Sequence, residues 1–430
     1  MAILIDDTQI LGFTAILKEE LIPAMGCTEP IAIALAAAHA RTLLDGEPFL
    51  RLRVGCSGNI IKNVKSVIIP GTQSLFGVEA AAVAGAVAGD YSAGLQVLAK
   101  VTDEQKAEIT REYHQKDCQT YYLRSPHTLH IRVEAWSEHH ASIVEVQDRH
   151  DNCVYACADE VVILDAREQS RTGDSSATAI FRDQLCLALI KEYADTVDLS
   201  LVRPILSQQI EFNMAIAREG LNRKYGVNYS DVILARQPTV YEKMEAWASA
   251  ASEARMSGCE LPVVINSGSG NQGISSSVPG IVYCREKGYS EEQLLRMLCF
   301  SNLLTIYQKH YIGKLSAFCG AISATCSSGA ALTYIEGGTL EQISHTITNT
   351  LAVTAGIICD GAKPSCGAKI ATGLHAAIYA HQLATVGRAY SVGDGIVCHD
   401  ADATIRGIGH IAREGMATTD VQIMDVMLST

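Results

Sequence analysis

Basic residues are scarce in this sequence. The 430 residues include 34 Lys and Arg against 47 Asp and Glu, which gives a formal net charge of −13. A surface with this balance repels polyanions, so we expect neither nucleic acid nor an anionic membrane surface as a partner. The N-terminus also lacks a basic segment before an apolar run, because Asp6 and Asp7 stand there, so we expect no secretory signal peptide.

One uncharged stretch has the length of a membrane span. Residues 315–335 contain no charged side chain, but they include several serines, threonines and glycines. We interpret this stretch as a buried helix that packs tightly through its small residues. With no secretory signal and no span, we expect a cytoplasmic protein with no membrane partner.

The 14 cysteines include no C-x-x-C pair. This absence argues against a structural zinc site, and the spacing also misses the compact runs of ferredoxins. Because a reducing cytosol keeps thiols free, we expect no disulfide framework and interpret most of the cysteines as small core residues. The sequence also lacks a phosphate-binding P-loop and a serine nucleophile elbow.

The hydrophobic pattern divides the chain into three regions. Helical periodicity covers residues 6–20, and a second helix is expected from Pro30 to Leu44. Strands are then expected at residues 49–54, 65–69, 120–123, 128–136 and 141–147, with helices at 78–89 and 102–116. After a polar linker at 166–176, further helices are expected at residues 177–194, 201–225, 240–256, 291–311, 315–335, 340–357 and 370–383.

This order predicts an α+β fold that is mainly helical. An isolated pair of helices cannot bury its apolar faces, so the first helices should pack with the distant C-terminal ones. We therefore predict a helical domain made of residues 1–45 and 170–430. Residues 46–169, linker included, form an inserted α+β domain that contains the strands.

A glycine-rich segment follows the strand-like run that starts at Leu261. It has the G-x-G-x-x-G pattern of dinucleotide sites, but Pro279 should interrupt the required helix and no βαβ alternation surrounds it, so we do not predict such a site. Its backbone N–H groups and short polar side chains suit a small carboxylate or phosphate, although an ordinary tight loop is an equal alternative. The residues concerned are Asn266, Ser267, Gly268, Ser269, Gly270, Asn271 and Gly273.

Three cysteines lie where the chain breaks its helices. Gly361 and Pro364 separate Cys359 from Cys366, so a loop can turn both sulfurs inward. Cys27 lies beside a helix start, where a thiolate is favoured. Cys319 and Cys326 lie on one expected helix, so at most one of them joins the others. Such a dispersed set suits a metal cluster with an open coordination site, although each cysteine alone could be a core residue.

Four separated motifs carry a resemblance to a known family. They are PAMGCTEP at 23–30, Arg255-Met256 followed by NSGSGNQG at 266–273, LSAFCGA at 315–321 and ICDGAKPSCGAK at 358–369. In this order they resemble the L-cysteine desulfidase family, which is similar to the alpha chain of iron–sulfur L-serine dehydratases. The resemblance covers nearly the whole chain, with residues 46–165 matching less specifically.

The resemblance implies a [4Fe–4S] cluster, no pyridoxal phosphate, and conversion of L-cysteine to pyruvate, ammonia and hydrogen sulfide. Carried onto this sequence, the three cluster ligands are Cys319, Cys359 and Cys366, whereas Cys326 has no counterpart. Cys27 becomes the base or a transient fourth ligand. Contacts to the substrate are then expected from Thr28, Glu29, Arg255, Asn266, Ser267, Gly268, Ser269, Gly270 and Asn271, with a structural salt bridge as an equal alternative for Arg255.

The expected chemistry is β-elimination from a small amino-acid substrate. Three thiolates leave one iron of a cluster open to the leaving group, while a base takes the Cα proton. Dehydration of L-serine on the same cluster is the first alternative, since the sequence does not discriminate a thiol from a hydroxyl leaving group. A non-catalytic iron or redox sensor is an alternative of another class. A homodimer is the ordinary expectation for the assembly.

Overall fold

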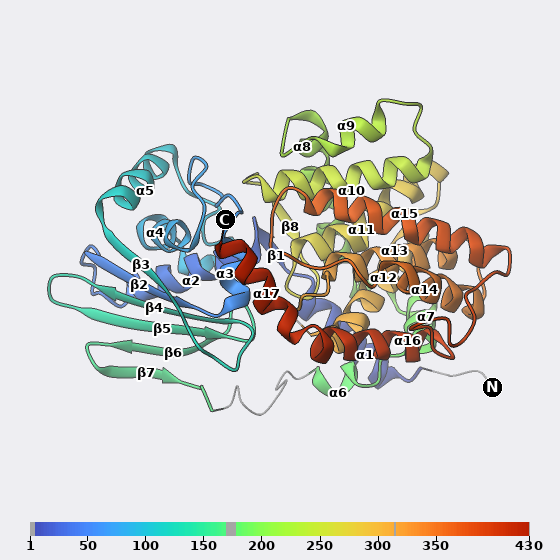
Figure 1. Cartoon of the computed structure of the whole chain (residues 1–430), viewed down its shortest axis with the longest axis horizontal. Helices are drawn as coiled ribbons and strands as arrows, with labels where there is room; N and C mark the ends of the chain where they lie inside the picture. The colour runs from blue at the N-terminus through green and yellow to red at the C-terminus, as the bar shows by residue number, and fades with distance from the viewer. Residues whose placement is uncertain (1–4, 169–177, 314, 430) are drawn as a thin grey trace.

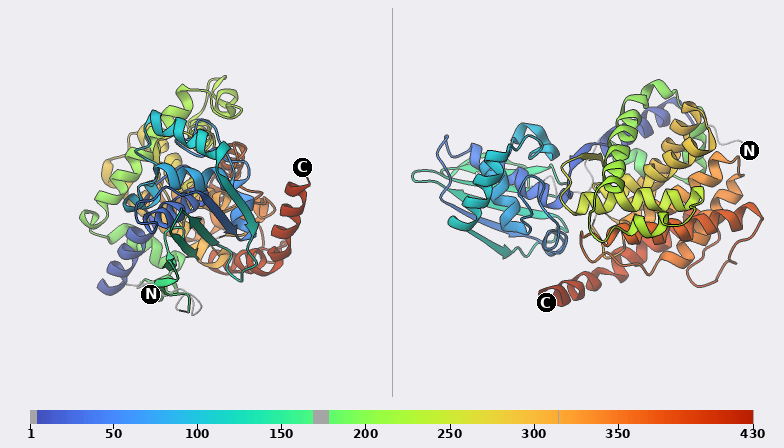
Figure 2. Two further views of the ribbon diagram at one scale, coloured as in Figure 1. Left: turned by 90° about the vertical axis from the view of Figure 1, so that its left-hand side faces the viewer. Right: turned by 90° about the horizontal axis from the view of Figure 1, so that it is seen from above.

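The chain folds into two lobes that lie side by side (Figures 1 and 2). A computed structural model describes residues 5–168, 178–313 and 315–429. We call residues 28–165 the sheet lobe, and residues 7–20 together with 179–416 the helical lobe. The predicted fold class, α+β and mainly helical, is confirmed.

The sheet lobe is built on one mixed sheet of six strands. Its order is β3-β2-β4-β5-β6-β7, with β2 and β3 parallel and the other neighbours antiparallel. In β4, Ile131, Val133 and Ala135 are fully buried and alternate with half-buried polar residues, so one face of the sheet is apolar. The strands are β2 (Arg51–Cys56), β3 (Asp117–Tyr122), β4 (His130–Trp136), β5 (Ala141–Gln147), β6 (Cys153–Ala158) and β7 (Val161–Asp165).

Helix α2 (Thr28–Thr42) covers the apolar face of this sheet. It packs on β4 and β5 from one side and on α4 (Val78–Ala88) from the other. The contact with α4 is very close, because a Cβ added at Gly85 would lie 2.0 Å from the carbonyl oxygen of Ala34. The lobe also contains α3 (Gly58–Val64), η1 (Tyr91–Gln96) and α5 (Asp103–Gln115).

The position of α2 differs from the expectation that residues 1–45 pack as one unit with the C-terminal helices. Of the two N-terminal helices, α1 (Asp7–Glu20) contacts α6 and α12 in the helical lobe. Helix α2 is apolar on all sides, with Ala36, Ala37 and Ala38 buried, and therefore needs cover around its whole circumference. The sheet and α4 supply that cover together.

Helix α13 (Gly320–Ile335) lies at the centre of the helical lobe. This helix is the uncharged stretch noted above, and it packs against α11, α12, α14 and α15 through small buried residues. No helix of the described residues is both long and apolar enough to cross a membrane. The remaining helices of the lobe are α6 (Ala179–Arg182), α7 (Leu187–Thr196), η3 (Leu199–Leu201), α8 (Arg203–Asn222), α9 (Tyr229–Leu234), α10 (Val240–Met256), α11 (Gly270–Lys287), α12 (Glu291–Ile312), α13 (Gly320–Ile335), α14 (Leu340–Thr354), α15 (Cys366–Thr385), α16 (Ala401–His410) and η4 (Ile411–Gly415).

Two connections tie the lobes together. Strand β1 (Pro23–Met25), just before α2, pairs antiparallel with β8 (Pro262–Val264), just before the glycine-rich segment. Helix α17 (Ala417–Leu428) leaves the helical lobe and contacts α3, where Asp420 forms an ion pair with the buried Lys62 (Figure 1). Strand β1 and helix α17, far apart in the sequence, thus both lie at the junction of the two lobes.

The local predictions fail at some short elements. No strand forms over residues 65–69, where Ile68 makes a single bridge to Phe76 and the preceding residues form α3. Strands β6 and β7 extend the sheet beyond the predicted ones. Most of the linker predicted at 166–176 lies outside the described residues.

Substituting Gly85 by alanine tests the close packing of α2 on α4. The added methyl group must displace the backbone at Ala34, so we expect a loss of about 1–3 kcal/mol in the free energy of unfolding, measured by urea denaturation. Gly356→Ala is the matched control, because an added Cβ there meets nothing within 4 Å. Equal stability of the two variants would contradict the packing described.

Candidate active site between the lobes

Three of the four candidate cysteines stand at the N-terminal ends of helices. Cys27 is the N-cap residue of α2, Cys319 is the N-cap residue of α13, and Cys366 is the first residue of α15. Cys359 lies in the non-helical segment before α15. The N-terminus of a helix stabilises a negatively charged ligand or thiolate.

Backbone pairing brings the segments of Cys319 and Cys359 side by side. Phe318 and Ile358 form an antiparallel bridge, and the N–H of Cys359 donates to the carbonyl of Ala317 at 2.6 Å. The thiols of Cys359 and Cys366 both lie within electrostatic range of Cys319. Burial has the largest effect on the pKa of Cys319, followed by these two neighbouring thiols. Together they raise this pKa to about 12.

The turn between Cys359 and Cys366 is built against the sheet lobe. Gly361 has φ +92°, and a Cβ there would lie 2.4 Å from the carbonyl oxygen of Lys62 on α3. The ammonium of Lys62 donates to the carbonyl of Cys359 at 3.2 Å. The chain therefore turns between Cys359 and Cys366, as Gly361 and Pro364 predict, and Lys62 of the sheet lobe contacts this turn.

Cys27 belongs to the same region. Its side chain is buried with Val67 and Met256, and Cys366 packs against this small cluster. Cys326, by contrast, is fully buried between helices, and its sulfur contacts the carbonyl of Ile347. Of the two cysteines that share helix α13, Cys319 alone lies with the others.

The Cys27 thiol donates a hydrogen bond to Glu29 Oε2 at 2.9 Å. The other carboxylate oxygen accepts from Asn63 Nδ2 at 3.0 Å and lies 4.0 Å from His150 Nε2. Burial opposes ionisation of Glu29, but His150 and Cys27 outweigh it and lower the pKa of Glu29 to about 2. Burial and the Glu29 charge raise the pKa of Cys27 well above its usual value, so the thiolate expected from the helix start alone is wrong.

The glycine-rich segment makes a tight turn directly before α11. Ser267 and Gly268 have positive φ, and Asn266 forms a backbone bridge with Ser269. Thr28 Oγ1 donates to the carbonyl of Gly268 at 2.8 Å, which joins the start of α2 to this turn. The N-terminal ends of α2 and α11 thus meet across the boundary between the lobes.

Helix α11 continues through Pro279, contrary to the predicted interruption. A proline removes the hydrogen bond to the carbonyl four residues earlier, here that of Ser275. Ser328 Oγ on α13 donates to this carbonyl at 2.5 Å and replaces the missing partner. Helix α11 therefore continues past Pro279 because α13 supplies a hydrogen bond to the Ser275 carbonyl. The sequence alone does not show this contact.

Three buried polar atoms around this turn have no hydrogen-bond partner among the described residues. They are Arg255 Nε, Gln272 Oε1 and His150 Nε2. The Arg255 guanidinium donates through Nη1 to Asn271 at 3.2 Å, and its Nε would lie 2.3 Å from a Cβ added at Gly270. Burying polar atoms without hydrogen bonds costs free energy, so a ligand that bonded to these atoms would stabilise the site.

A cavity of about 980 Å³ opens between the lobes beside this turn. Its wall includes His150, Ser267 and Gly268, together with Ile306 and Lys309 on α12. Burial, partly offset by nearby Cys359 and Cys319, lowers the pKa of Lys309 to about 8. The cavity brings residues from both lobes to one space.

Sequence analysis singled out none of three residues of this site, His150, Asn63 and Lys309. All three are buried, and His150 is 8% exposed. No spacing in the sequence connects them with the cysteines, because they arrive from the sheet lobe and from the last turn of α12. These residues are identified by being polar and buried, which the three-dimensional structure shows and the sequence does not.

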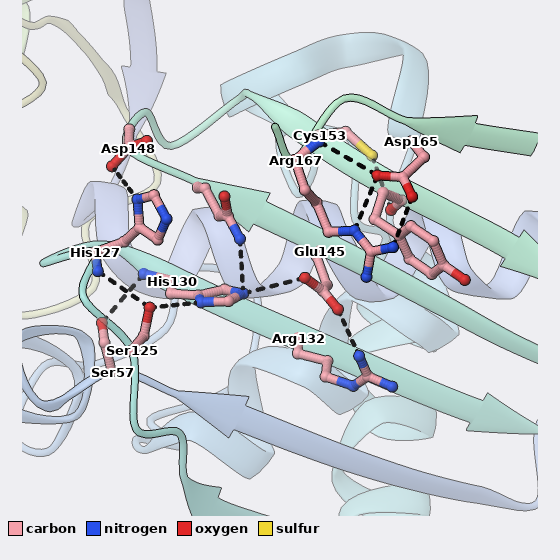
Figure 3. A network of polar contacts seen from close by, with 12 residues as sticks. Ser57, Ser125, His127, His130, Arg132, Glu145, Asp148, Cys153, Asp165 and Arg167 are labelled. Carbon is pink, nitrogen blue, oxygen red and sulfur yellow. Dashed lines mark hydrogen bonds and ion pairs between the residues drawn. The ribbon is translucent and has the colours of Figure 1, made fainter. Parts of the chain in front are cut away.

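A polar network on the sheet holds the turn that carries His150 (Figure 3). His127 Nδ1 lies 2.9 Å from Asp148 Oδ1, two residues before His150. Next to it, the buried Glu145 lies between His130 and Arg132. Burial opposes ionisation of Glu145, but these two partners outweigh it and lower its pKa. We assign this network a structural role in fixing the turn between β5 and β6.

The described residues contain no group of three or more histidine, cysteine, aspartate and glutamate side chains that could hold one metal ion. The thiols of Cys319, Cys359 and Cys366 lie within electrostatic range of one another. A cluster uses a separate iron for each thiolate, so its ligands lie farther apart than the ligands of one ion. The donor set is thus compatible with a cluster.

Comparison with known proteins places the chain in a family. Residues 92–425 match the model of the serine dehydratase alpha chain. The chain belongs to this family. The match spans Cys319, Cys359, Cys366 and the glycine-rich segment, whereas the segment with Cys27 precedes it. The expected relationship to the serine dehydratase alpha chain is therefore confirmed.

Several proteins that are similar to this chain along nearly their whole length carry the name UPF0597 protein. One from Lachnoclostridium phytofermentans is 46% identical over 415 residues, covering 96% of this chain and 98% of its own. One from Treponema denticola is 44% identical and covers 99% of both chains. One from Bacteroides fragilis is 35% identical and covers 96% of both. These names specify no activity.

The buried carboxylate of Glu29 makes the apoprotein sensitive to acid. Its pKa lies at about 2 in the folded chain, below the usual 4.5, so its stabilising effect is complete above about pH 4.5 and is lost as the pH falls toward 2. The full effect is about 3 kcal/mol, and about 1 kcal/mol of it disappears between about pH 5.5 and pH 3.5.

We expect Glu29→Gln to lack this part of the acid-dependent loss in urea denaturation at the two pH values. The control Glu286→Gln removes an exposed carboxylate paired with Lys243 and should follow the wild-type profile. If Glu29→Gln loses as much stability as the wild type on acidification, the charged state of Glu29 described here is wrong.

Proposed function

We propose that the protein is an iron–sulfur-dependent β-eliminating lyase that converts L-cysteine to pyruvate, ammonia and hydrogen sulfide. The observation that carries this proposal is the meeting of Cys319, Cys359 and Cys366 with Cys27 and the glycine-rich turn at the boundary between the lobes. Membership of the serine dehydratase alpha chain family supports the reaction type.

The residues fit a [4Fe–4S] cluster. The three thiols come from two segments, with Cys319 at the N-terminus of α13 and Cys359 and Cys366 at the two ends of the turn that leads into α15. The Gln272 side chain lies close to Gly320, the neighbour of Cys319, because a Cβ added at Gly320 would lie 3.0 Å from it, and Arg255 lies within electrostatic range of Cys27. Cys319, Cys359 and Cys366 would hold the cluster, with no role for pyridoxal phosphate.

When bound, such a cluster supplies a Lewis acid, because three protein thiolates leave one iron open. The protein's own groups then orient the amino acid. The N–H groups at the start of α11 and the Arg255 guanidinium bind its carboxylate, which fixes Cα in the site.

We assign the removal of the Cα proton to Cys27. In the structure this residue is a neutral thiol that donates to Glu29, so it must ionise to act as the base. The charge of Arg255 lies within electrostatic range and favours that ionisation against burial. The enamine product needs no further catalyst to tautomerise and hydrolyse to pyruvate and ammonia.

L-Serine is the second candidate substrate, which the name of the matching family favours. Both amino acids share the carboxylate, the ammonium group and Cα, and they differ in the leaving group alone. A comparison of kcat/KM for L-cysteine and L-serine on the same preparation decides between them.

Anaerobic reconstitution with iron and sulfide tests the proposal. We expect a brown protein that releases sulfide and pyruvate in equal amounts from L-cysteine. Iron and acid-labile sulfide are counted in the same samples. Protein that takes up a cluster but releases neither product from L-cysteine nor pyruvate from L-serine would overturn the proposed lyase activity.

Cysteine variants separate ligands from the base. Cys359→Ala and Cys366→Ala should lose the visible absorbance of the cluster, whereas Cys27→Ala should keep it and lose at least about 100-fold in kcat. Cys326→Ala is the matched control, because Cys326 shares α13 with Cys319 but lies buried elsewhere. Loss of the cluster in Cys27→Ala would make this residue a ligand instead of the base.

A further inference from the structure

Gln272 carries a buried amide to which the site described so far gives no role. It is the third residue of α11 and is 3% exposed. Its side-chain oxygen, Oε1, has no hydrogen-bond partner among the described residues. A buried amide oxygen without a hydrogen bond costs free energy, so this acceptor is suited to a ligand that brings a donor.

The sequence at the start of α11 is that of a capping box. In this motif a serine or threonine precedes the helix, and a glutamine or glutamate at the third helical position reaches back to the N–H of that residue. Ser269 and Gln272 have this spacing, but neither of the two hydrogen bonds forms. The N–H of Ser269 donates instead to the carbonyl of Asn266 at 3.0 Å, so it is not available to Gln272.

The other described helices with glutamine at the third position all use it as a cap. In each of them the glutamine oxygen accepts from the N–H of the residue that precedes the helix, at 2.9–3.2 Å. These glutamines are Gln9 in α1, Gln105 in α5, Gln293 in α12 and Gln342 in α14. Gln272 therefore differs from them, because its amide does not cap its own helix.

The Gln272 amide lies instead against the start of α13. A Cβ added at Gly320 would lie 3.0 Å from its Cδ, 3.1 Å from its Nε2 and 3.2 Å from its Oε1, so the absence of a side chain at Gly320 makes room for the amide. Gly320 is the first residue of α13 and directly follows Cys319. The amide therefore extends from the glycine-rich turn to the neighbour of a proposed cluster ligand.

An amino acid carries one anionic and one cationic group, and the site needs a partner for each. The first N–H groups of α11 and the Arg255 guanidinium are donors, which suit the carboxylate. The ammonium group carries donors alone and needs an acceptor. Both oxygens of Glu29 already accept hydrogen bonds, from Cys27 and from Asn63, whereas Gln272 Oε1 accepts none. Gln272 belongs to the same helix turn as the N–H groups, so one small ligand can contact both.

We propose that Gln272 binds the ammonium group of the amino-acid substrate through Oε1. This inference rests on the proposed function for the identity of the ligand as an amino acid. It supplies a partner for the charged group of the substrate to which the proposed function assigns none. Gln272 is then a substrate-binding residue that selects α-amino acids over carboxylic acids without an amino group.

Two small carboxylates test the proposal without turnover. L-Alanine has the carboxylate and the ammonium group of the substrate but no leaving group, and propionate differs from it by lacking the ammonium group. Their dissociation constants are measured by titration calorimetry on the anaerobically reconstituted protein. We expect Gln272→Met to weaken L-alanine binding about tenfold or more, because a hydrogen bond to a charged group is lost, with propionate binding unchanged.

Variants with matched chemistry complete the binding test. Gln272→Glu keeps an acceptor oxygen and should retain most of the L-alanine affinity. Gln293→Met removes the glutamine at the same position of α12 and should bind both ligands as the wild type does. In turnover assays Gln272→Met should raise KM for L-cysteine with a smaller change in kcat. Its iron content and visible absorbance should match those of the wild type.

The stability of the apoprotein gives a second measurement. An amide oxygen without a hydrogen bond does not stabilise the fold, so Gln272→Met should leave the midpoint of urea denaturation unchanged or raise it. Gln293→Met loses a capping box and should lower the midpoint. A midpoint lowered as much in Gln272→Met as in Gln293→Met, or failure of Gln272→Met to fold, would show a structural role and overturn the inference.

The outcomes separate this inference from the proposed function. An equal loss of L-alanine and propionate binding in Gln272→Met, or a wild type that binds L-alanine no more tightly than propionate, would overturn the ammonium contact. Loss of iron in Gln272→Met would overturn it as well, because the amide would then support the cluster. Selective loss of L-alanine binding supports it even if the wild type releases no pyruvate, and in that case the proposed lyase activity alone fails.

Discussion

The site depends on one short backbone contact, the antiparallel pairing of β1 with β8. Three residues from each strand place the start of α2 next to the start of α11, although about 240 residues separate them in the chain. Without this pairing, Cys27 and Glu29 would belong to the sheet lobe alone, and the glycine-rich turn to the helical lobe alone. The hydrogen bond from Thr28 to Gly268 extends the contact into the site itself.

Polar atoms that are buried without a hydrogen-bond partner indicate where a ligand could bind, and several lie near the glycine-rich turn. Elsewhere the core is close-packed, as at Gly85 against Ala34. Around the glycine-rich turn, Arg255 Nε and Gln272 Oε1 are buried without a hydrogen-bond partner among the described residues, and His150 Nε2 has only the ion pair with Glu29 at 4.0 Å. Each buried polar atom without a hydrogen bond costs on the order of 1–3 kcal/mol, so a ligand that bonded to these atoms would stabilise this region.

The sequence predicts local chemistry better than it predicts which parts meet. The turn between Cys359 and Cys366 follows from Gly361 and Pro364, and the long helices follow from their apolar periodicity. The packing of α2 does not, since an alanine-rich helix has no distinct apolar face that indicates its partner. His150 and Lys309 lie in segments with no motif, so their place in the site depends on tertiary packing.

Helix α17 has a consequence for how the protein matures. Its Asp420 engages Lys62, and Lys62 also holds the carbonyl of Cys359 within the cysteine-bearing turn. During synthesis this last helix leaves the ribosome after every cysteine of the chain. The contact from Asp420 to Lys62 therefore forms only after all of the cysteines have been synthesised, which leaves the nascent protein an interval in which the thiols are present but this turn is not yet fixed in place.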